Sequence, residues 1–531
     1  METPDETWPA QPRRERSGIE WVRLLLPAVL IFVLAASDRQ YLSDFWQHLA
    51  RGREIVSTGT IVSSDPFTFT VAGASYRDCN WLTQVFYYGT YQIGGLSLVQ
   101  AINALVLAMA MAVLTWQALR ASGSTRLAGA VGVCAVAGLA QSLTVRPQSF
   151  SILLFVIAYQ ILDRAIHNRR WLFILPPLLA LWANVHGGFS IGLVLIGAFL
   201  LADVLRLGRA MIGTLKVDRW SVIAPRSQWT VLREHTPWAL GACLAACTAA
   251  TLLNPYTIDV YRYAGALSKI GIERGIEEWL PPSLQSWMGI MLILSVQGFA
   301  ILLYQRFGKA SALTITLLLC FLPPALISMR MIPWWFLSMA PMFAKLLAGD
   351  RQVESLRSRM GMDDLLAEEP TPRSSPALAR FAFILMAVAC VGSLPWADRI
   401  NPLSGTMRST QRTEDDLAAL VPALPRGRVF TRLEWGNFLC WARKADNQIF
   451  AEGHIEMYPD RVWEEYMNVS SGAEGWQKVL RDYDVQTLML DASYHRELLG
   501  NIAQSRDWKE VARSGPAVVF ARQSPAMSDA R

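Results

Sequence analysis

Charged side chains are scarce in this chain. Asp, Glu, Lys and Arg make up 17% of its 531 residues, whereas 52% of the residues are hydrophobic. Soluble domains usually carry roughly 25% charged residues, so the composition excludes an ordinary soluble protein and predicts a membrane protein. The seven cysteines show no paired, metal-like spacing. Basic residues are not interleaved with aromatic ones, so no nucleic-acid partner is expected.

Long apolar runs occupy most of the first three-quarters of the chain. Most of them are close to the ~20 residues that cross a ~30 Å hydrocarbon core. The two shortest runs are expected to lie inside a helical bundle, to continue past their charged ends, or to meet a locally thinned bilayer. We therefore predict a polytopic α-helical membrane protein with about eleven transmembrane helices. The runs are 24–37, 96–118, 127–145, 149–162, 171–185, 189–205, 237–253, 286–305, 311–328, 331–348 and 379–397.

Loop charges predict the orientation of these helices. A cytoplasmic N-terminus puts about twice as many Lys and Arg residues on the cytoplasmic side as on the other side. The loop after the first helix is an exception, because it carries Arg39, Arg51, Arg53 and Arg77 outside. An anionic ligand would explain these four arginines. After eleven spans, the C-terminal segment lies outside the cytoplasm.

The chain is predicted to have three parts. Residues 1–23 form a cytoplasmic tail, 24–397 a transmembrane domain with a first outer loop at 38–95, and 398–531 a soluble extracytoplasmic domain. A flexible linker, "DDLLAEEPTPRSSPA", interrupts the second part. Cys79 and Cys440 are the only cysteines expected on the oxidising side, so a disulfide between them is one alternative.

The C-terminal part reads as a small α/β domain. "RVFTRL", "NQIFAEG" and "VQTLMLDA" are typical of strands, and "WKEVARS" with "PAVVFAR" of a closing hairpin. Two segments between them, "DRVWEEYMNVSSGAEGWQKVLRDY" and "RELLGNIAQSRDW", are predicted helices. No spacing orders its acidic residues and histidine into a catalytic set, so we interpret the domain as a cap or an acceptor-recognition module. These residues are Glu434, Glu452, His454, Glu456 and Asp460.

A charged helix is predicted directly outside the first transmembrane run, in "YLSDFWQHLARGREIVSTG". Asp44, His48 and Arg51 share one face of this helix because they are spaced i, i+4 and i+7. The helix would lie along the membrane surface with Trp46 among the headgroups. A structural role is an equally simple reading, since Ser43 is a good N-cap and an acid is favoured at a helix N-terminus.

Further polar residues interrupt the apolar pattern at the outer face. Arg146 in "TVRPQSF" and Arg330 in "SMRMIPWW" lie at helix ends, where an arginine either serves a function or extends to the headgroups. Asp65 in "SSDPF" also fits a turn. Asn184 and His186 precede a glycine pair, and could bind a substrate or cap the turn.

The order of these motifs resembles that of GT-C glycosyltransferases, which include protein O-mannosyltransferases and lipid A aminoarabinose transferases. The series "SDFWQHLARGREI", "SSDPFTFT", "NWLTQVFYY", "TVRPQSFS", "LWANVHGGF", "LLNPYTIDVY" and "RMIPWWF" is similar to an uncharacterised bacterial branch over nearly the whole chain. The resemblance implies a multi-pass protein of the bacterial inner membrane. It also implies transfer of a sugar from a polyprenyl-phosphate donor to a glycan, lipid or protein acceptor outside.

The resemblance assigns roles to individual residues. Asp44 occupies the position of the general base, with Asp65 and Asp78 as further acids of the first loop. His48, Arg51, Asn184 and His186 would contact substrates. Arg146 and Arg330 would neutralise the lipid phosphate, since arginine pairs well with phosphate.

The sequence departs from the family at two positions. Phe45 follows Asp44 where many members have a second acid, and Gln148 replaces an acid of some relatives. No cofactor is therefore expected, although Asp44, His48 and Asp78 leave a divalent cation as an alternative. Two other functions remain open: an O-antigen polymerase or ligase, and a non-catalytic transporter or envelope-assembly scaffold.

Overall fold

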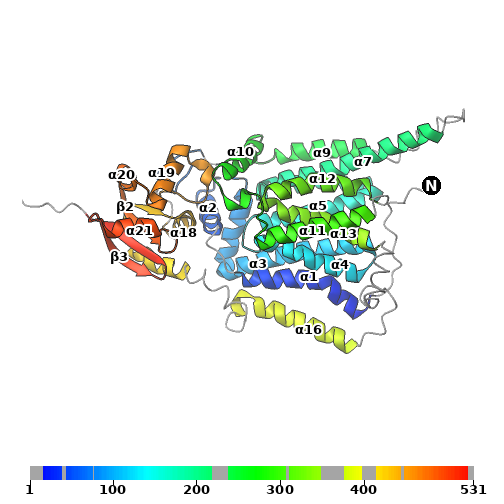
Figure 1. Cartoon of the computed structure of the whole chain (residues 1–531), viewed down its shortest axis with the longest axis horizontal. Helices are drawn as coiled ribbons and strands as arrows, with labels where there is room; N and C mark the ends of the chain where they lie inside the picture. Colours follow the sequence, from blue (N-terminus) through cyan, green and yellow to red (C-terminus); the bar gives the residue numbers. More distant parts are fainter. Residues whose placement is uncertain are drawn as a thin grey trace, which may run out of the picture.

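The computed structural model describes residues 16–38, 44–75, 77–217, 237–305, 310–348, 376–397, 414–443 and 448–523. The predicted N-cap Ser43, Arg39 and nearly all of the acidic linker lie outside these residues. The protein is a helical bundle with a small α/β domain at one end (Figure 1). This confirms the predicted fold class.

Each of the eleven apolar runs forms a helix. In the part of the chain that the structure describes, seven helices are long and apolar enough to cross a membrane, and α4, α9 and α12 are shorter apolar helices. The remaining run is covered by η2 and α6 together. The number of helices that cross the membrane stays a prediction. The helices are α1 (Gly18–Ser37), α3 (Trp81–Ser122), α4 (Thr125–Gly138), α5 (Gln148–His167), η2 (Arg169–Ile174), α6 (Leu175–Val185), α7 (Phe189–Val217), α9 (Pro237–Thr251), α11 (Trp287–Gln305), α12 (Ala312–Ile327), α13 (Ile332–Ala348) and α16 (Pro376–Ser393).

The start of α1 and the α/β domain lie at opposite ends of the bundle (Figure 1). An odd number of crossings produces this arrangement. Which end faces the cytoplasm stays a prediction. Helices α2 (Phe45–Thr58) and α10 (Asp259–Glu273) lie at the end that faces the α/β domain. The short helix η4 (Glu277–Trp279) contacts α10, and η6 (Met329–Met331) contacts η4.

Helix α3 extends beyond the bundle toward the α/β domain. Its helical geometry breaks at Gly94 and Gly95, and Gly95 has a φ of 64°, which favours glycine. The segment before this kink packs against α2. Gly52 of α2 makes this packing possible, because a Cβ there would lie 2.1 Å from the carbonyl oxygen of Gln84.

Helix α2 starts and ends close to the predicted positions, but its surroundings differ from the prediction. Asp44 occupies the N-cap position, and Gly59 ends the helix with a φ of 68°. Trp46 is buried, packs edge-on against Phe438, and donates a hydrogen bond of 3.1 Å to Glu414. The prediction that Trp46 lies among lipid headgroups was therefore wrong, because the α/β domain covers this face of the helix.

The α/β domain contains a four-stranded sheet in the order β1-β2-β4-β3, with β1 and β2 parallel and the other pairs antiparallel. Its strands are β1 (Arg428–Thr431), β2 (Val485–Asp491), β3 (Trp508–Ser514) and β4 (Ala517–Arg522). Its main helices are α18 (Leu433–Ala442), α19 (Asp460–Ser471), α20 (Trp476–Asp482) and α21 (Arg496–Ala503).

One predicted strand, "NQIFAEG", is replaced by single bridges. Ile449 pairs with Val429 of β1 on one side and with Thr68 of the first outer loop on the other. The backbone here connects two parts of the protein that are far apart in sequence. A regular strand is therefore not formed, and the chain beyond Ile449 turns toward the bundle.

Candidate functional site

Two groups of charged side chains lie between the bundle and the α/β domain. We define the exposed cluster as Asp44, Arg146, Glu278 and Arg330. We define the buried cluster as Arg51, Asp65, Asp78, Glu452 and His454. Salt bridges link the side chains of each cluster, and α2 contributes a residue to both.

The exposed cluster is centred on two arginines that share one carboxylate. Arg146 Nη1 contacts Glu278 Oε1, and Arg330 Nη1 lies 3.8 Å from Glu278 Oε2. Arg146 Nε also lies 3.8 Å from Asp44 Oδ2. The side chains are partly open to solvent, with exposed fractions of 42% for Asp44, 38% for Glu278, 28% for Arg330 and 21% for Arg146.

Four separate elements position these side chains. Asp44 begins α2, and Arg146 precedes Pro147, the N-cap of α5. Arg330 lies in η6 with its guanidinium 4.8 Å from the centre of the Trp279 ring. The backbones of η4 and η6 are joined, because Met329 N donates to the carbonyl oxygen of Leu280 over 3.0 Å.

Asp44 is ionised in this environment. Burial raises its pKa, but the positive charges around it, led by Arg146 and including Arg330 and His454, outweigh burial and hold the pKa below its usual value. Burial lowers the pKa of Arg146, but the negative charges of Asp44 and Glu278 outweigh burial and raise this pKa above its usual value. The cluster therefore holds two permanent cations beside a carboxylate that stays charged at neutral pH.

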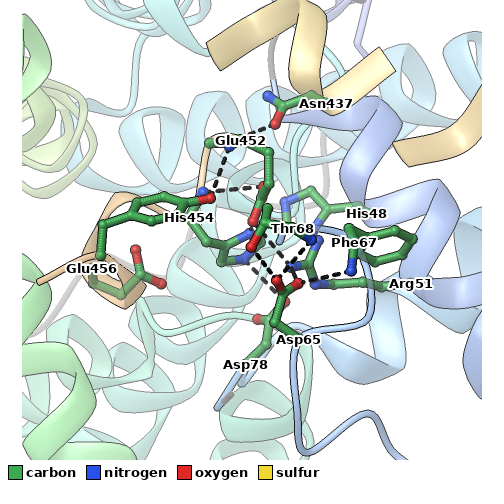
Figure 2. A network of polar contacts seen from close by, with 12 residues as sticks. His48, Arg51, Asp65, Phe67, Thr68, Asp78, Asn437, Glu452, His454 and Glu456 are labelled. Carbon is green, nitrogen blue, oxygen red and sulfur yellow. Dashed lines mark hydrogen bonds and ion pairs between the residues drawn. The ribbon is translucent and has the colours of Figure 1, made fainter. Parts of the chain in front are cut away.

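The buried cluster joins α2 and the first outer loop to the α/β domain (Figure 2). Arg51 Nη2 lies 3.1 Å from Glu452 Oε1 and 3.9 Å from Asp65 Oδ1, and all three side chains are fully buried. Asp65 also accepts hydrogen bonds from the backbone nitrogens of Phe67 and Thr68 and from the Thr68 hydroxyl. Its carboxylate is therefore engaged in a turn, as the "SSDPF" motif suggested.

His454 lies between two carboxylates of the buried cluster. Its Nδ1 is 3.2 Å from Glu452 Oε2, and its Nε2 is 3.6 Å from Asp78 Oδ2. Burial and Arg51 lower the pKa of His454, but Glu452 and Asp78 outweigh them, so the pKa rises from 6.5 to about 10. Burial raises the pKa of Glu452, and Arg51 and His454 lower it to about 2. Both groups are charged at neutral pH.

Asp78 also organises the start of α3. It accepts a hydrogen bond of 2.8 Å from the backbone nitrogen of Asn80, the N-cap residue, and another from the Gln84 amide. The same amide lies 3.2 Å from His48 Nδ1. Burial is the main reason that the pKa of His48 falls to about 4, so this imidazole is neutral.

The predicted substrate ligands Asn184 and His186 lie at the turn between α6 and α7. Asn184 Oδ1 accepts a hydrogen bond of 2.8 Å from Trp81 Nε1. His186 Nδ1 is 2.8 Å from Ser151 Oγ and accepts from the backbone nitrogen of Gly188 over 3.0 Å. Burial, with a further contribution from Arg330, lowers the pKa of His186 to about 3. These contacts stabilise the turn.

Protein groups contact the arginines of the first outer loop that the structure describes. Arg51 pairs with Glu452, Arg77 lies 3.2 Å from Asp259, and Arg53 donates to the carbonyl oxygens of Cys440 and Trp441. These contacts account for the three arginines without an anionic ligand, and the predicted ligand stays a prediction. They dock the loop onto α10 and the α/β domain.

Further contacts fix the α/β domain on the bundle. The Tyr263 hydroxyl donates to Glu456 over 2.8 Å, and Arg274 donates to the carbonyl oxygens of Ile455 and Tyr458. The sequence patterns did not predict which acids of this domain contact the bundle. The segment "EGHIE" could have indicated them, because its three polar residues alternate directly after the bridge at Ile449.

Glu278 was also missed. It lies in "GIEEWLPP", an acidic pair beside a tryptophan between two apolar helices. Among the described residues, no three His, Cys, Asp or Glu side chains are arranged as metal ligands. Cys79 and Cys440 are both free thiols, so the disulfide considered from the sequence is not formed.

Comparisons with known proteins give a limited result. No protein-family model matches the sequence, and no curated protein matches it. Two solved structures of ArnT from Cupriavidus metallidurans are similar, one bound to undecaprenyl phosphate and one in the apo state. The first shows 14% identity and a TM-score of 0.47, over 95% of this chain and 98% of that chain. The second shows the same identity and TM-score over 94% and 97%. The likeness concerns the course of the chain alone and identifies no functional residue.

Proposed function

We propose that the chain is an integral membrane glycosyltransferase of GT-C type. It would transfer a sugar from a polyprenyl-phosphate donor to an acceptor at the end of the bundle that carries the α/β domain. The observation that supports this most is the exposed cluster. An ionised, half-exposed carboxylate lies beside two arginines, which is the charge arrangement that this reaction needs.

The proposed reaction exchanges one bond at the anomeric carbon for another. The acceptor oxygen or nitrogen attacks this carbon, while the bond from the carbon to the phosphate oxygen breaks and its electron pair leaves with the phosphate. Asp44 takes the proton of the acceptor as general base. Arg146 and Arg330 stabilise the phosphate, whose negative charge increases as the bond breaks.

The same arginines would adjust the basicity of Asp44 during the reaction. Their charges lower the pKa of Asp44 in the resting protein, so the carboxylate is ready to accept a proton but is a weak base. As the leaving phosphate gains charge, it offsets the effect of the arginines. The proton affinity of Asp44 then rises in step with bond cleavage.

We assign a positioning role to the buried cluster. Asp65, Asp78 and Arg51 are buried and engaged by protein groups, and His48 receives a hydrogen bond from Gln84. Such groups cannot reach a substrate without breaking these contacts. They would instead fix α2, and with it Asp44, against the α/β domain. Asn184 and His186 would shape the neighbouring turn.

The test uses the purified full-length protein with undecaprenyl-phosphate-linked pentose and hexose donors in the presence of a membrane extract as acceptor source. Release of undecaprenyl phosphate reports transfer whatever the acceptor is. Asp44→Asn should reduce the rate by about 10²–10⁴. Glu54→Gln, on the same helix, is the control and should keep full activity.

A scaffold or transporter function predicts a different result. Asp44→Asn would then leave the phenotype of cells unchanged, and no donor would be consumed by the wild-type protein. Equal rates for Asp44→Asn and the wild type, at equal amounts of folded protein, would refute the assignment of Asp44 as base.

A further inference from the structure

Glu278 occupies the position between Arg146 and Arg330 that the proposed function assigns to the donor phosphate. We propose that Glu278 is an internal substitute for this phosphate, which a polyprenyl-phosphate lipid displaces when it binds. This inference rests on the proposed function. It gives the two arginines a carboxylate of the protein itself as counterion before the lipid binds.

The geometry supports an exchangeable contact. One oxygen of the Glu278 carboxylate contacts Arg146, and the other lies 3.8 Å from Arg330. A phosphate offers oxygens that can bridge two guanidinium groups in the same way. The Glu278 side chain is 38% exposed. Because exposed ion pairs contribute little free energy, Glu278 can leave the arginines for solvent at a small cost.

Charge balance points to the same conclusion. Asp44 and Glu278 carry two negative charges, and Arg146 and Arg330 carry two positive charges. A sugar linked to a lipid through one phosphodiester carries a single negative charge, so it can replace the Glu278 carboxylate without changing the net charge of the cluster. Transfer of the sugar leaves a monoester with a charge of about −1.5 to −2 near neutral pH. Once Asp44 has released its proton, this product gives the cluster a net negative charge, and replacement of the product by Glu278 restores neutrality.

The backbone around Glu278 is anchored, so the exchange needs only a side-chain movement. The carbonyl oxygen of Glu278 accepts a hydrogen bond of 3.1 Å from the Ser328 hydroxyl. Leu280 accepts from Met329, and Trp279 packs on Arg330. Glu278 therefore stays beside the site after it has released the arginines, and it competes with the lipid in every cycle.

The experiment compares dissociation constants of the full-length protein for undecaprenyl phosphate, measured by thermophoresis in detergent. Glu278→Gln should bind undecaprenyl phosphate about three- to tenfold more tightly than the wild type, because the competitor is neutral. Glu277→Gln changes an exposed acid of the same turn and should bind like the wild type. Binding of undecaprenol, which lacks phosphate, should be the same for all three proteins.

Arg146→Gln and Arg330→Gln separate the failure of this inference from that of the proposed function. If both arginine variants bind more weakly while Glu278→Gln binds no more tightly than the wild type, the internal substitute is refuted and the phosphate site remains. If neither arginine variant weakens binding, the phosphate site itself is refuted. An equal gain of Glu278→Gln with inorganic phosphate alone would overturn the lipid as the displacing ligand.

Discussion

The exposed and buried clusters use the same residue types for opposite purposes. In each, a glutamate pairs with an arginine, through Glu278 and Arg146 in one and Glu452 and Arg51 in the other. The carboxylate of Glu278 is partly open to solvent, whereas that of Glu452 is fully buried. An exposed ion pair exchanges partners easily, but a buried one cannot lose a partner without a large cost. Exposure therefore decides which pair is available for chemistry.

The largest difference in stability is expected between variants that neutralise the glutamate of the buried pair or the glutamate of the exposed pair. Glu452→Gln leaves Arg51 with less compensation in a buried place and should destabilise the protein by about 3–5 kcal/mol. Glu278→Gln should cost less than about 1 kcal/mol. The measurement is the midpoint of thermal unfolding of the full-length protein in detergent. Equal midpoints for the two variants would remove the distinction between the clusters.

A smaller effect is expected from Gly52→Ala, which tests whether α2 connects the clusters. The new Cβ would meet the carbonyl oxygen of Gln84 at 2.1 Å, so α2 must shift, at a cost of about 1–3 kcal/mol. The release of undecaprenyl phosphate should fall at a temperature where the protein is still folded.

Gly89→Ala is the matched control for this variant. Gly89 lies in α3, five residues after Gln84, which Gly52 contacts. A Cβ at Gly89 would meet no other part of the protein within 4 Å. It should be neutral or stabilise the helix by up to about 1 kcal/mol. Loss of activity in both glycine variants would speak against α2 packing as the cause.

The pH dependence of stability should identify the charge of His454. Its folded pKa of about 10 lies above the ordinary value of 6.5, so its stabilising effect is complete below pH 6.5 and is lost as the pH rises through about 10. The unfolding midpoint of the wild type should therefore fall between pH 7 and 10 by more than that of His454→Gln.

The pKa of His495 is shifted in the opposite direction to that of His454. Burial lowers its pKa from 6.5 to about 4, so its contribution is present above pH 6.5 and is lost as the pH falls through about 4. His495→Gln should leave the alkaline part of the profile unchanged. A flat alkaline profile in the wild type would mean that His454 is neutral.

The smallest effect should appear in the acid limb of activity. Asp44 has a lowered pKa, and in the proposed reaction it acts as base only while it is ionised, so activity should be present above this pKa and be lost as the pH falls through it. Arg146→Gln removes the largest attractive charge and should move the acid limb to higher pH. An acid limb at the same pH in both proteins would show that Arg146 does not act on Asp44.

The helices and the α/β domain could be predicted from the sequence because local patterns determine them. Apolar runs of membrane length and alternating strand patterns depend on near neighbours in the chain. Helix α2, with Asp44 at its start and Gly59 at its end, follows from the same kind of signal. Asp44, Arg146 and Arg330, which the family resemblance placed at one site, lie in one cluster of ion pairs, and their roles stay predictions.

The partners of these residues could not be predicted, since they come from distant segments. Nothing near Arg51 indicates that Glu452 will neutralise it, so the arginine suggested an external anion. Trp46 fits a membrane surface equally well until the α/β domain covers it. Long-range docking thus converts residues that resemble ligands into residues that stabilise the fold.

The separation of Arg51 from Glu452 by 401 positions has a consequence for biosynthesis. The first outer loop is synthesised long before Glu452, so when the first helices insert, Arg51 can pair with Asp65 of its own loop but not with Glu452. Only a complete translation product can close the buried network and bring α2 to its final place. A product that ends before Glu452 would lack the carboxylate that lies closest to Arg51.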